Sequence, residues 1–145
     1  LDPSVCIYEC EVRVFAECQP LAKHPYPIDL PTSTAFSDYR TKLMNATELK
    51  VWLDHKRQHR LLLDVRERRE YRRGHIPGGE LFPLRDLVRE ASSMSWDQEI
   101  VLVCRSGRRS TRAAGILQNM GFSSVHVLKG GMLAWEASGY PVMVQ

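Results

Sequence analysis

A single cysteine followed by arginines is the feature of this sequence that could carry out chemistry. In the stretch VLVCRSGRRSTR, residues 101–112, an apolar run ends at Cys104, and four arginines follow within the next eight positions. The thiolate is the nucleophilic form of cysteine, and nearby positive charge favours it. A cysteine that only fills the core, the structural alternative, needs neither arginines nor a glycine beside it. The stretch therefore predicts a reactive, anionic sulfur at Cys104.

The residues after this cysteine are of the types that hold an anion. A helix expected to begin at about Ser110 directs its unpaired backbone N–H groups towards the preceding loop. Gly107 permits a positive φ angle, so that successive amides can turn towards one point. Positive charge is added by Arg105, Arg108 and Arg109. We expect a site for an anionic sulfur and an anionic substrate.

The spacing between the cysteine and the arginines separates two reaction classes. The loop of a cysteine phosphatase resembles H-C-x5-R, in which the arginine stands six positions after the cysteine. Here the sixth position is Ser110, Val103 replaces the histidine, and Arg109 stands at the fifth position. The shorter ring suits sulfur rather than phosphate, so a phosphatase or an arsenate reductase is the less favoured alternative.

The flanking sequence predicts strands that alternate with helices. Short apolar runs typical of buried strands occupy residues 60–65, 99–103 and 124–128. Helices are expected at residues 45–56, 67–73, 84–94, 110–120 and 132–138. This alternation indicates an α/β fold with a mainly parallel sheet, in which ligands bind outside the carboxyl ends of the strands. Cys104 directly follows the strand expected at 99–103.

Two zones of different composition meet near residue 40. Residues 19–39 contain four of the eight prolines and a Ser/Thr cluster, which favours an extended connector. Residues 1–18 fit a helix or a strand equally well. We therefore divide the chain into an N-terminal extension, residues 1–40, and a domain, residues 41–145. Because the chain does not begin with methionine, we expect a fragment or a processed product.

Composition and charge argue against several functions. The 145 residues are 43% hydrophobic and 26% charged, which is typical of globular proteins. No apolar run is long enough to span a membrane, and no signal peptide is visible. The net charge is only +3, and few aromatic residues accompany the arginines, so nucleic acid is not an expected partner. The cysteine pattern is no disulfide framework, which favours a cytoplasmic location.

Three of the four cysteines lie near the N-terminus. Cys6, Cys10, Cys18 and His24 could surround a zinc ion, but they lack the usual C-x2-C pair. We favour simple burial of these thiols, with sulfur transfer from Cys104 to one of them as an alternative. No metal or cofactor is expected.

Three motifs in the right order resemble the rhodanese family of sulfurtransferases. CRSGRR at 104–109 resembles the active-site loop of that family, C-x-x-G-x-R. LLLDVRERREYRRGHIPGG at 61–79 is similar to its upstream signature of D-V-R-E, E-Y and G-H-I-P-G-A, with Gly79 in place of the frequent alanine. LKGGMLAWEASGYPV at 128–142 resembles the closing signature of G-G, Trp and Gly-x-Pro. The resemblance covers about residues 45–142 and implies a rhodanese-like fold with helices on both faces of the sheet.

The resemblance also implies an activity. The cysteine would accept a sulfane sulfur from a small anionic donor such as thiosulfate, form a persulfide, and pass the sulfur to a thiophilic acceptor such as cyanide, a thiol or a protein. The implied loop residues are Cys104, Arg105, Ser106, Gly107, Arg108, Arg109 and Ser110. Asp64 and Arg66 are implied to support this loop through an ion pair or a hydrogen bond, with ordinary capping of the strand end as the alternative. We expect His75 to organise a turn rather than to transfer protons, and Trp135 to lie in the core.

A binding role remains the main alternative to an enzyme. In that case, the rhodanese-like domain would deliver sulfur, sense a signal or dock a partner within a larger protein.

Overall fold

Five parallel strands form one sheet in the part of the chain that the computed structural model describes, residues 41–55 and 57–145. The strands are β1 (Lys42–Met44), β2 (Arg60–Asp64), β3 (Gly79–Leu81), β4 (Glu99–Val103) and β5 (Ser124–Leu128), in the spatial order β1-β5-β4-β2-β3. The register aligns Arg60 with Glu99 and Asp64 with Val103. The carboxyl ends of the two central strands, β2 and β4, therefore lie side by side.

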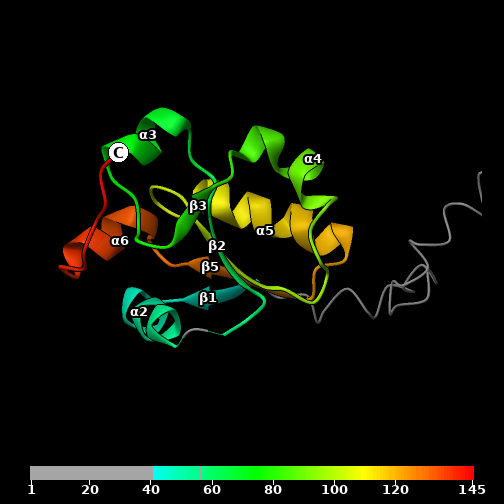
Figure 1. The fold of residues 1–145 in the computed structure, drawn as a ribbon, viewed down its shortest axis with the longest axis horizontal. Coiled ribbons are helices and arrows are strands. Elements are labelled where there is room, and N and C mark those ends of the chain that lie inside the picture. Colours follow the sequence, from blue (N-terminus) through cyan, green and yellow to red (C-terminus); the bar gives the residue numbers. More distant parts are fainter. Residues whose placement is uncertain (1–40, 56) are drawn as a thin grey trace, which may run out of the picture. The chain divides into compact units, whose positions relative to one another are not determined.

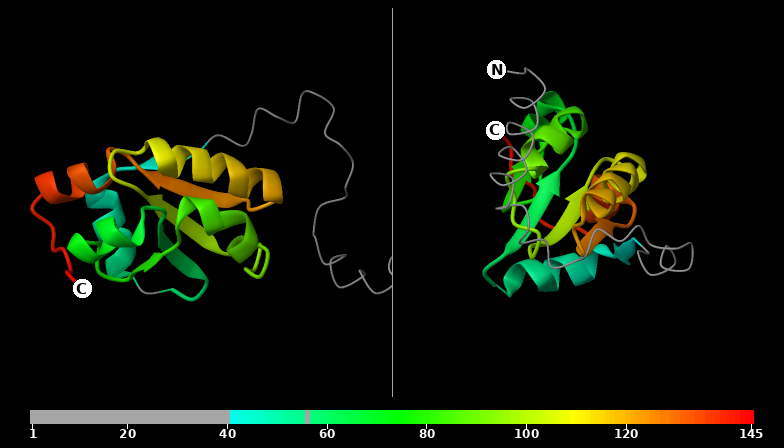
Figure 2. Two further views of the ribbon diagram at one scale, coloured as in Figure 1. Left: turned by 90° about the horizontal axis from the view of Figure 1, so that it is seen from above. Right: turned by 90° about the vertical axis from the view of Figure 1, so that its right-hand side faces the viewer.

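Helices cover both faces of this sheet (Figures 1 and 2). They are α2 (Ala46–Asp54), α3 (Arg68–Arg73), the 3₁₀ helix η3 (Leu84–Asp86), α4 (Leu87–Ala91), α5 (Arg108–Met120) and α6 (Gly131–Ala137). Buried side chains of α4 and α5 pack on one face of the sheet, and those of α2 and α6 pack on the other. The predicted α/β fold, with a parallel sheet flanked by helices on both faces, is confirmed.

Alternate residues along β4 and at its end enter two separate cores. Ile100, Leu102 and Cys104 belong to the core under α4 and α5, whereas Val101 and Val103 belong to the core under α2 and α6. All five residues are at most 1% exposed. Burial on both sides explains why this strand has a continuous apolar sequence instead of an alternating one.

The helix expected at 84–94 was wrong in its extent. The chain there forms η3 followed by α4, which ends at Ala91. The hydroxyl groups of Ser92 and Ser93 donate hydrogen bonds to the carbonyls of Arg89 and Glu90. Serine side chains that bond to the backbone in this way compete with helix continuation.

Two edge strands were not predicted. β1 and β3 have only three residues each, too few for a period of two to stand out from the sequence. Long-range pairing forms both of them, because β1 pairs with β5 and β3 pairs with β2.

The predictions for residues 1–40 lie outside the described residues. These are the extension and its connector, and the zinc, burial and sulfur-acceptor alternatives for Cys6, Cys10, Cys18 and His24. In the described part, no helix combines the length and the apolar character that crossing a membrane would require.

Candidate active site

Cys104 is placed at the junction between β4 and α5. The strand ends at Val103, and the helix begins at Arg108, two residues before the expected start at Ser110. Gly107 occupies the N-cap position with φ 105°, a left-handed conformation that side chains disfavour. The chain can therefore turn sharply and aim the first amides of α5 back at the cysteine.

The thiol of Cys104 is enclosed by hydrogen-bond donors of this junction. The backbone N–H of Gly107 donates to Sγ at 3.0 Å, and the hydroxyl group of Ser110 lies 3.3 Å from Sγ. Burial raises the pKa of the thiol, but hydrogen bonds from the Ser110 side chain and from the amides of Ser110, Gly107 and Ser106 outweigh it. The net result is a pKa below the ordinary value of 9.0, which favours the thiolate.

The three arginines expected at the loop, Arg105, Arg108 and Arg109, differ in exposure and in ion pairing. Arg105 and Arg108 are exposed to solvent, and among residues 41–55 and 57–145 no ion pair involves either of them. Arg109 is partly buried and forms an ion pair. In the described part of the chain, the hydrogen bonds to Sγ come from loop amides, that of Gly107 among them, and from the Ser110 hydroxyl group, and not from an arginine.

The Ser110 hydroxyl group can follow the protonation state of the thiol. Its Oγ lies 3.3 Å from Sγ and 3.1 Å from the carbonyl oxygen of Gly107. One hydroxyl proton cannot serve both neighbours at once. Beside a neutral thiol it can point to the carbonyl, and beside a thiolate it can turn to the sulfur.

Replacement of Ser110 by alanine should therefore make Cys104 less reactive at neutral pH. The variant lacks one donor to the thiolate, so we expect roughly a tenfold slower alkylation at pH 7 and a midpoint of the pH profile at higher pH. Iodoacetamide labelling of the peptide that contains Cys104, measured by mass spectrometry from pH 5 to 10, tests this. Thr111→Val is the matched control, because the Thr111 hydroxyl donates to the same Gly107 carbonyl at 2.7 Å. Equal effects of the two changes would contradict the prediction.

Arg109 is held by a carboxylate that sequence reasoning did not select. Its two terminal nitrogens donate to the two oxygens of Glu70, each at 2.7 Å. Such a two-point pair fixes the direction of the guanidinium as well as its charge. Glu70 is the glutamate of the E-Y motif, which was its only sequence signal. The pair connects α3 to the first turn of α5, 39 residues further along the chain.

The Glu70–Arg109 pair should make stability depend on acid pH. The hydrogen bonds from Arg109 lower the pKa of Glu70 from 4.5 to about 2. Since the folded value lies below the unfolded one, the contribution is complete above pH 4.5 and is lost as the pH falls towards 2. We expect Glu70→Gln to reduce the unfolding free energy at pH 7 by about 1 kcal/mol, allowing for solvent screening of this partly exposed pair.

Urea unfolding at pH 7 and at pH 3 measures this difference. The exposed Glu136, replaced by glutamine, is the control for loss of one negative charge. A Glu70→Gln deficit that does not shrink at the lower pH would contradict the assignment.

Asp64 and Arg66 bind mainly to each other. The guanidinium of Arg66 donates to both carboxylate oxygens of Asp64, the shortest contact being 2.6 Å, and also to the carbonyl of Gly74 at 2.7 Å. The two residues are 3% and 6% exposed. In the described part of the chain, no side-chain hydrogen bond from this pair reaches residues 104–110. The pair therefore ties the carboxyl end of β2 to the turn after α3.

His75 and Trp135 are both buried, His75 shortly after α3 and Trp135 within α6. The His75 ring stacks on Tyr71 with centroids 3.8 Å apart, and its backbone exchanges two hydrogen bonds with Met143 at 2.9 Å. Trp135 is 1% exposed and donates to the Pro141 carbonyl at 2.9 Å. Both residues thus have contacts that organise the C-terminal segment.

A shallow groove of about 460 Å³ borders the loop after Cys104. Its lining comes from the loop, from α5 and from β1 and β5, and includes Ser106, Arg108, Leu43 and Lys129. Leu43 is 61% exposed. The groove therefore offers an apolar wall and two cations beside the thiol-bearing loop.

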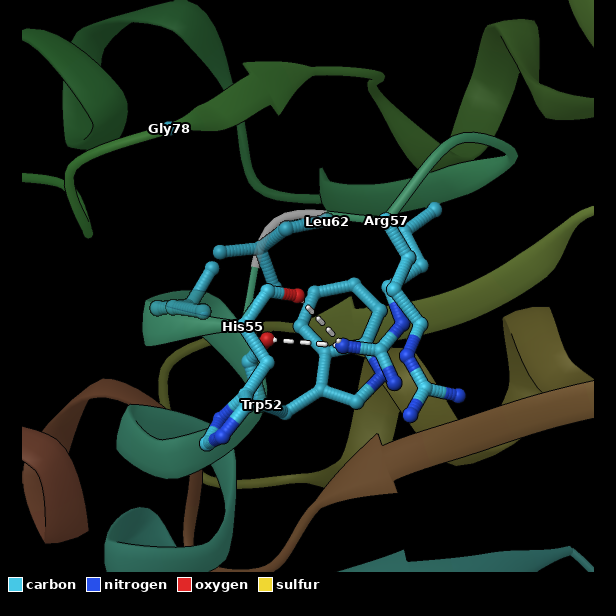
Figure 3. A pocket seen from close by; sticks show the side chains of 7 residues that line it. Trp52, His55, Arg57, Leu62 and Gly78 are labelled. Carbon is cyan, nitrogen blue, oxygen red and sulfur yellow. Dashed lines mark hydrogen bonds between the residues drawn. The ribbon is translucent and has the colours of Figure 1, made fainter.

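A second pocket, of about 310 Å³, lies at the C-terminal end of α2 (Figure 3). Arg60 is bound there by the carbonyls of Trp52 and His55, each at 2.9 Å, and by Glu99. Its guanidinium also lies over the Trp52 ring, 4.8 Å from the centroid. These contacts hold the end of α2 against the amino ends of the strands, whereas Cys104 follows a carboxyl end. Among the described residues, no cluster of His, Cys, Asp and Glu is arranged to hold a metal ion.

Comparison with known proteins agrees with this arrangement. The sequence profile of the rhodanese-like domain matches residues 45–138. The thiosulfate sulfurtransferase GlpE of Pseudoalteromonas translucida is 36% identical over 78 residues, which cover 54% of this chain and 74% of GlpE. The putative sulfur carrier protein YrkF of Bacillus subtilis is 40% identical over 74 residues, 51% of this chain, and this match spans only 40% of YrkF.

A solved structure shares the fold. The crystal structure of the Alr3790 protein from Anabaena superposes with a TM-score of 0.66 at 35% identity, covering 70% of this chain and 82% of that chain.

Proposed function

The chain belongs to the rhodanese-like domain family, whose relatives here include named sulfurtransferases, and on this premise we propose that Cys104 transfers sulfane sulfur through a persulfide. The observation that carries the proposal is the thiol itself. Cys104 directly follows β4, and its Sγ accepts a hydrogen bond from the Gly107 N–H at 3.0 Å. The pKa of the thiol is lowered because hydrogen bonds from the loop amides and Ser110 outweigh its burial. A thiolate held in this way is ready to attack an electrophilic sulfur.

The first half-reaction uses thiosulfate or a similar anion. The Cys104 thiolate attacks the outer sulfur of the donor, a new S–S bond forms, and the donor S–S bond breaks. Sulfite leaves with the bonding electron pair, and the enzyme retains a persulfide anion. The amides that hold the thiolate also suit this anion, and the exposed Arg105 and Arg108 attract the donor.

The second half-reaction regenerates the thiolate. A thiophilic acceptor, such as cyanide or a thiolate, attacks the outer sulfur of the persulfide, and Cys104 leaves with the electron pair. Neither half-reaction needs a metal or a cofactor. We place the reaction in a reducing, cytoplasmic compartment, because Cys104 must remain a free thiol between turnovers.

A delivery role for the same persulfide is the second candidate function. It is favoured by the groove beside the loop, whose Leu43, Arg108 and Lys129 could contact a protein acceptor. The relative YrkF, named a putative sulfur carrier protein, supports the same role. In this case a protein thiol, instead of a small molecule, removes the sulfur.

Intact-mass measurement after incubation with thiosulfate tests the proposed function. We expect a gain of one sulfur atom, mapped by peptide analysis to Cys104 and removed by cyanide. No gain, or a gain found only at Cys6, Cys10 or Cys18, would overturn the assignment. Hydrolysis of an artificial phosphoester that depends on Cys104, without any sulfur gain, would instead favour a phosphatase.

The two candidate acceptor classes separate in a second measurement. The isolated persulfide form is mixed with cyanide or dithiothreitol, and separately with a protein that carries an exposed thiol, such as reduced thioredoxin. Discharge by the small molecules supports the enzymatic proposal, whereas discharge by the protein alone supports delivery.

A further inference from the structure

The first turn of α6 holds the loop that carries the thiol. The backbone N–H of Met132 donates to the carbonyl oxygen of Cys104 at 2.8 Å, and that of Leu133 donates to the carbonyl oxygen of Arg105 at 3.2 Å. Figures 1 and 2 show the start of α6 next to the connection between β4 and α5. Amides of the first helical turn have no partner within their own helix, so these two are available for the loop.

This contact determines where a loop amide points. The bond between Arg105 and Ser106 is a trans peptide, as are all peptide bonds of the described residues. In a planar trans peptide the C=O and N–H groups point in opposite directions. Because the Arg105 carbonyl is directed towards α6, the Ser106 N–H is directed away from α6. That N–H is one of the groups that stabilise the Cys104 thiolate.

Gly131 allows the helix to come this close. Its φ angle is +58°, and a Cβ atom at this position would lie 2.3 Å from the carbonyl oxygen of Cys104. The same atom would lie 2.6 Å from the carbonyl carbon and oxygen of Arg105. All three are backbone atoms of the loop, so a side chain at residue 131 must displace the loop or the helix.

We propose that Gly131 is a positioning residue for the nucleophile. Because it has no side chain, the Met132 and Leu133 amides of α6 can donate hydrogen bonds to the carbonyls of Cys104 and Arg105. These bonds orient the peptide groups of the loop so that loop amides point towards the sulfur. The inference deepens the proposed function, but it rests on that function only in taking Cys104 as the nucleophile. It concerns the orientation of the loop before any sulfur donor binds.

The first test compares two glycine substitutions in the full chain. Gly131→Ala should displace the loop, so alkylation of Cys104 by iodoacetamide should slow about tenfold at pH 7, and its pH profile should move to higher pH. Gly139→Ala is the matched control, because Gly139 has φ +72° but nothing lies within 4 Å of its added Cβ. It carries a similar backbone strain at the other end of α6 without touching the loop, and its pH profile should match that of the wild type.

A second pair of variants, at Leu133, tests one of these hydrogen bonds while Gly131 is kept. Leu133→Pro deletes the N–H that binds the Arg105 carbonyl, and proline is tolerated in the first turn of a helix. Leu133→Ala is its control, since it shortens the same exposed side chain and keeps the N–H. We expect the proline variant to move the pH profile to higher pH and the alanine variant to leave it unchanged. Circular dichroism establishes which variants remain folded.

The outcomes are decisive in either direction. If Gly131→Ala does not fold, the Leu133 pair alone decides. A pH profile that moves in Gly131→Ala or Leu133→Pro, but not in the controls, supports the positioning role. Folded variants that lose stability while their pH profiles match those of the controls would overturn it, because Gly131 would then be only structural. Since alkylation needs no sulfur donor, these results are independent of whether thiosulfate forms a persulfide.

Discussion

Replacement of Cys104 by serine is expected to abolish persulfide formation and to reduce sulfur transfer at least about 10³-fold. A hydroxyl group has almost the same size as the thiol, and it can still accept the Gly107 amide that now lies 3.0 Å from Sγ. The fold should therefore survive. The chemistry should not, because an oxygen at this position cannot form the disulfide-type bond that stores the transferred sulfur.

Thiocyanate production from thiosulfate and cyanide measures this loss, with circular dichroism as the check on folding. The matched control makes the same chemical change at other thiols: a variant in which Cys6, Cys10 and Cys18 are all serine should still gain sulfur at Cys104. Retention of sulfur transfer in Cys104→Ser would contradict the assignment of the nucleophile. Loss of sulfur gain in the triple variant would place the nucleophile in the N-terminal segment.

Of the substitutions considered, removal of the Asp64 carboxylate should reduce the free energy of unfolding most, by about 3–5 kcal/mol. The reason is that it leaves the buried charge of Arg66 without its counterion. In Asp64→Ala, the guanidinium of Arg66 keeps, among the described residues, only its hydrogen bond to the Gly74 carbonyl, and Arg66 is 6% exposed. An isolated buried cation is costly, since neither water nor a carboxylate compensates for its lost solvation. We expect a lower midpoint in urea unfolding with an unchanged slope.

A double variant separates the effect of the unpaired buried charge from the effect of side-chain packing at these two positions. Asp64→Leu combined with Arg66→Met removes both charges and keeps similar volume, so it should be more stable than Asp64→Ala. If the double variant is the less stable of the two, packing and not ion pairing explains the role of Asp64. Because Asp64 lies opposite Val103 in the sheet register, sulfur transfer by the stable double variant also shows whether this pair supports the loop.

The strand and the helix that flank Cys104 could be predicted from short stretches of sequence, and the same stretch predicts Cys104 as the nucleophile. The apolar run before Cys104 is a strand because both of its faces are buried, and Gly107 marks the turn into a helix. The helix expected at 45–56 begins with a capping box, in which Asn45 and Glu48 form reciprocal bonds 2.8 and 2.7 Å long. These signals work because each depends on residues within a few positions of one another.

The partners of the loop could not be read in that way. Glu70 binds Arg109 across 39 positions, and the two meet only because β2 and β4 are neighbours in the sheet. Asp64 and Arg66 were expected to support the loop through an ion pair or a hydrogen bond to it, with capping of the strand end as the alternative. In the structure they bind each other and Gly74.

The sequence by itself determined the fold class and the turn from strand to helix after Cys104, because local patterns of apolar residues, glycine and helix caps specify these, and it predicted that cysteine as the nucleophile. Only the tertiary structure decided how the loop is held. The amides of α6 reach the carbonyls of Cys104 and Arg105 through a gap that exists because residue 131 has no side chain. That contact joins segments more than 25 residues apart along the chain. Spacing within the loop predicts which atom reacts, whereas packing against distant segments decides how its amides are oriented towards the sulfur.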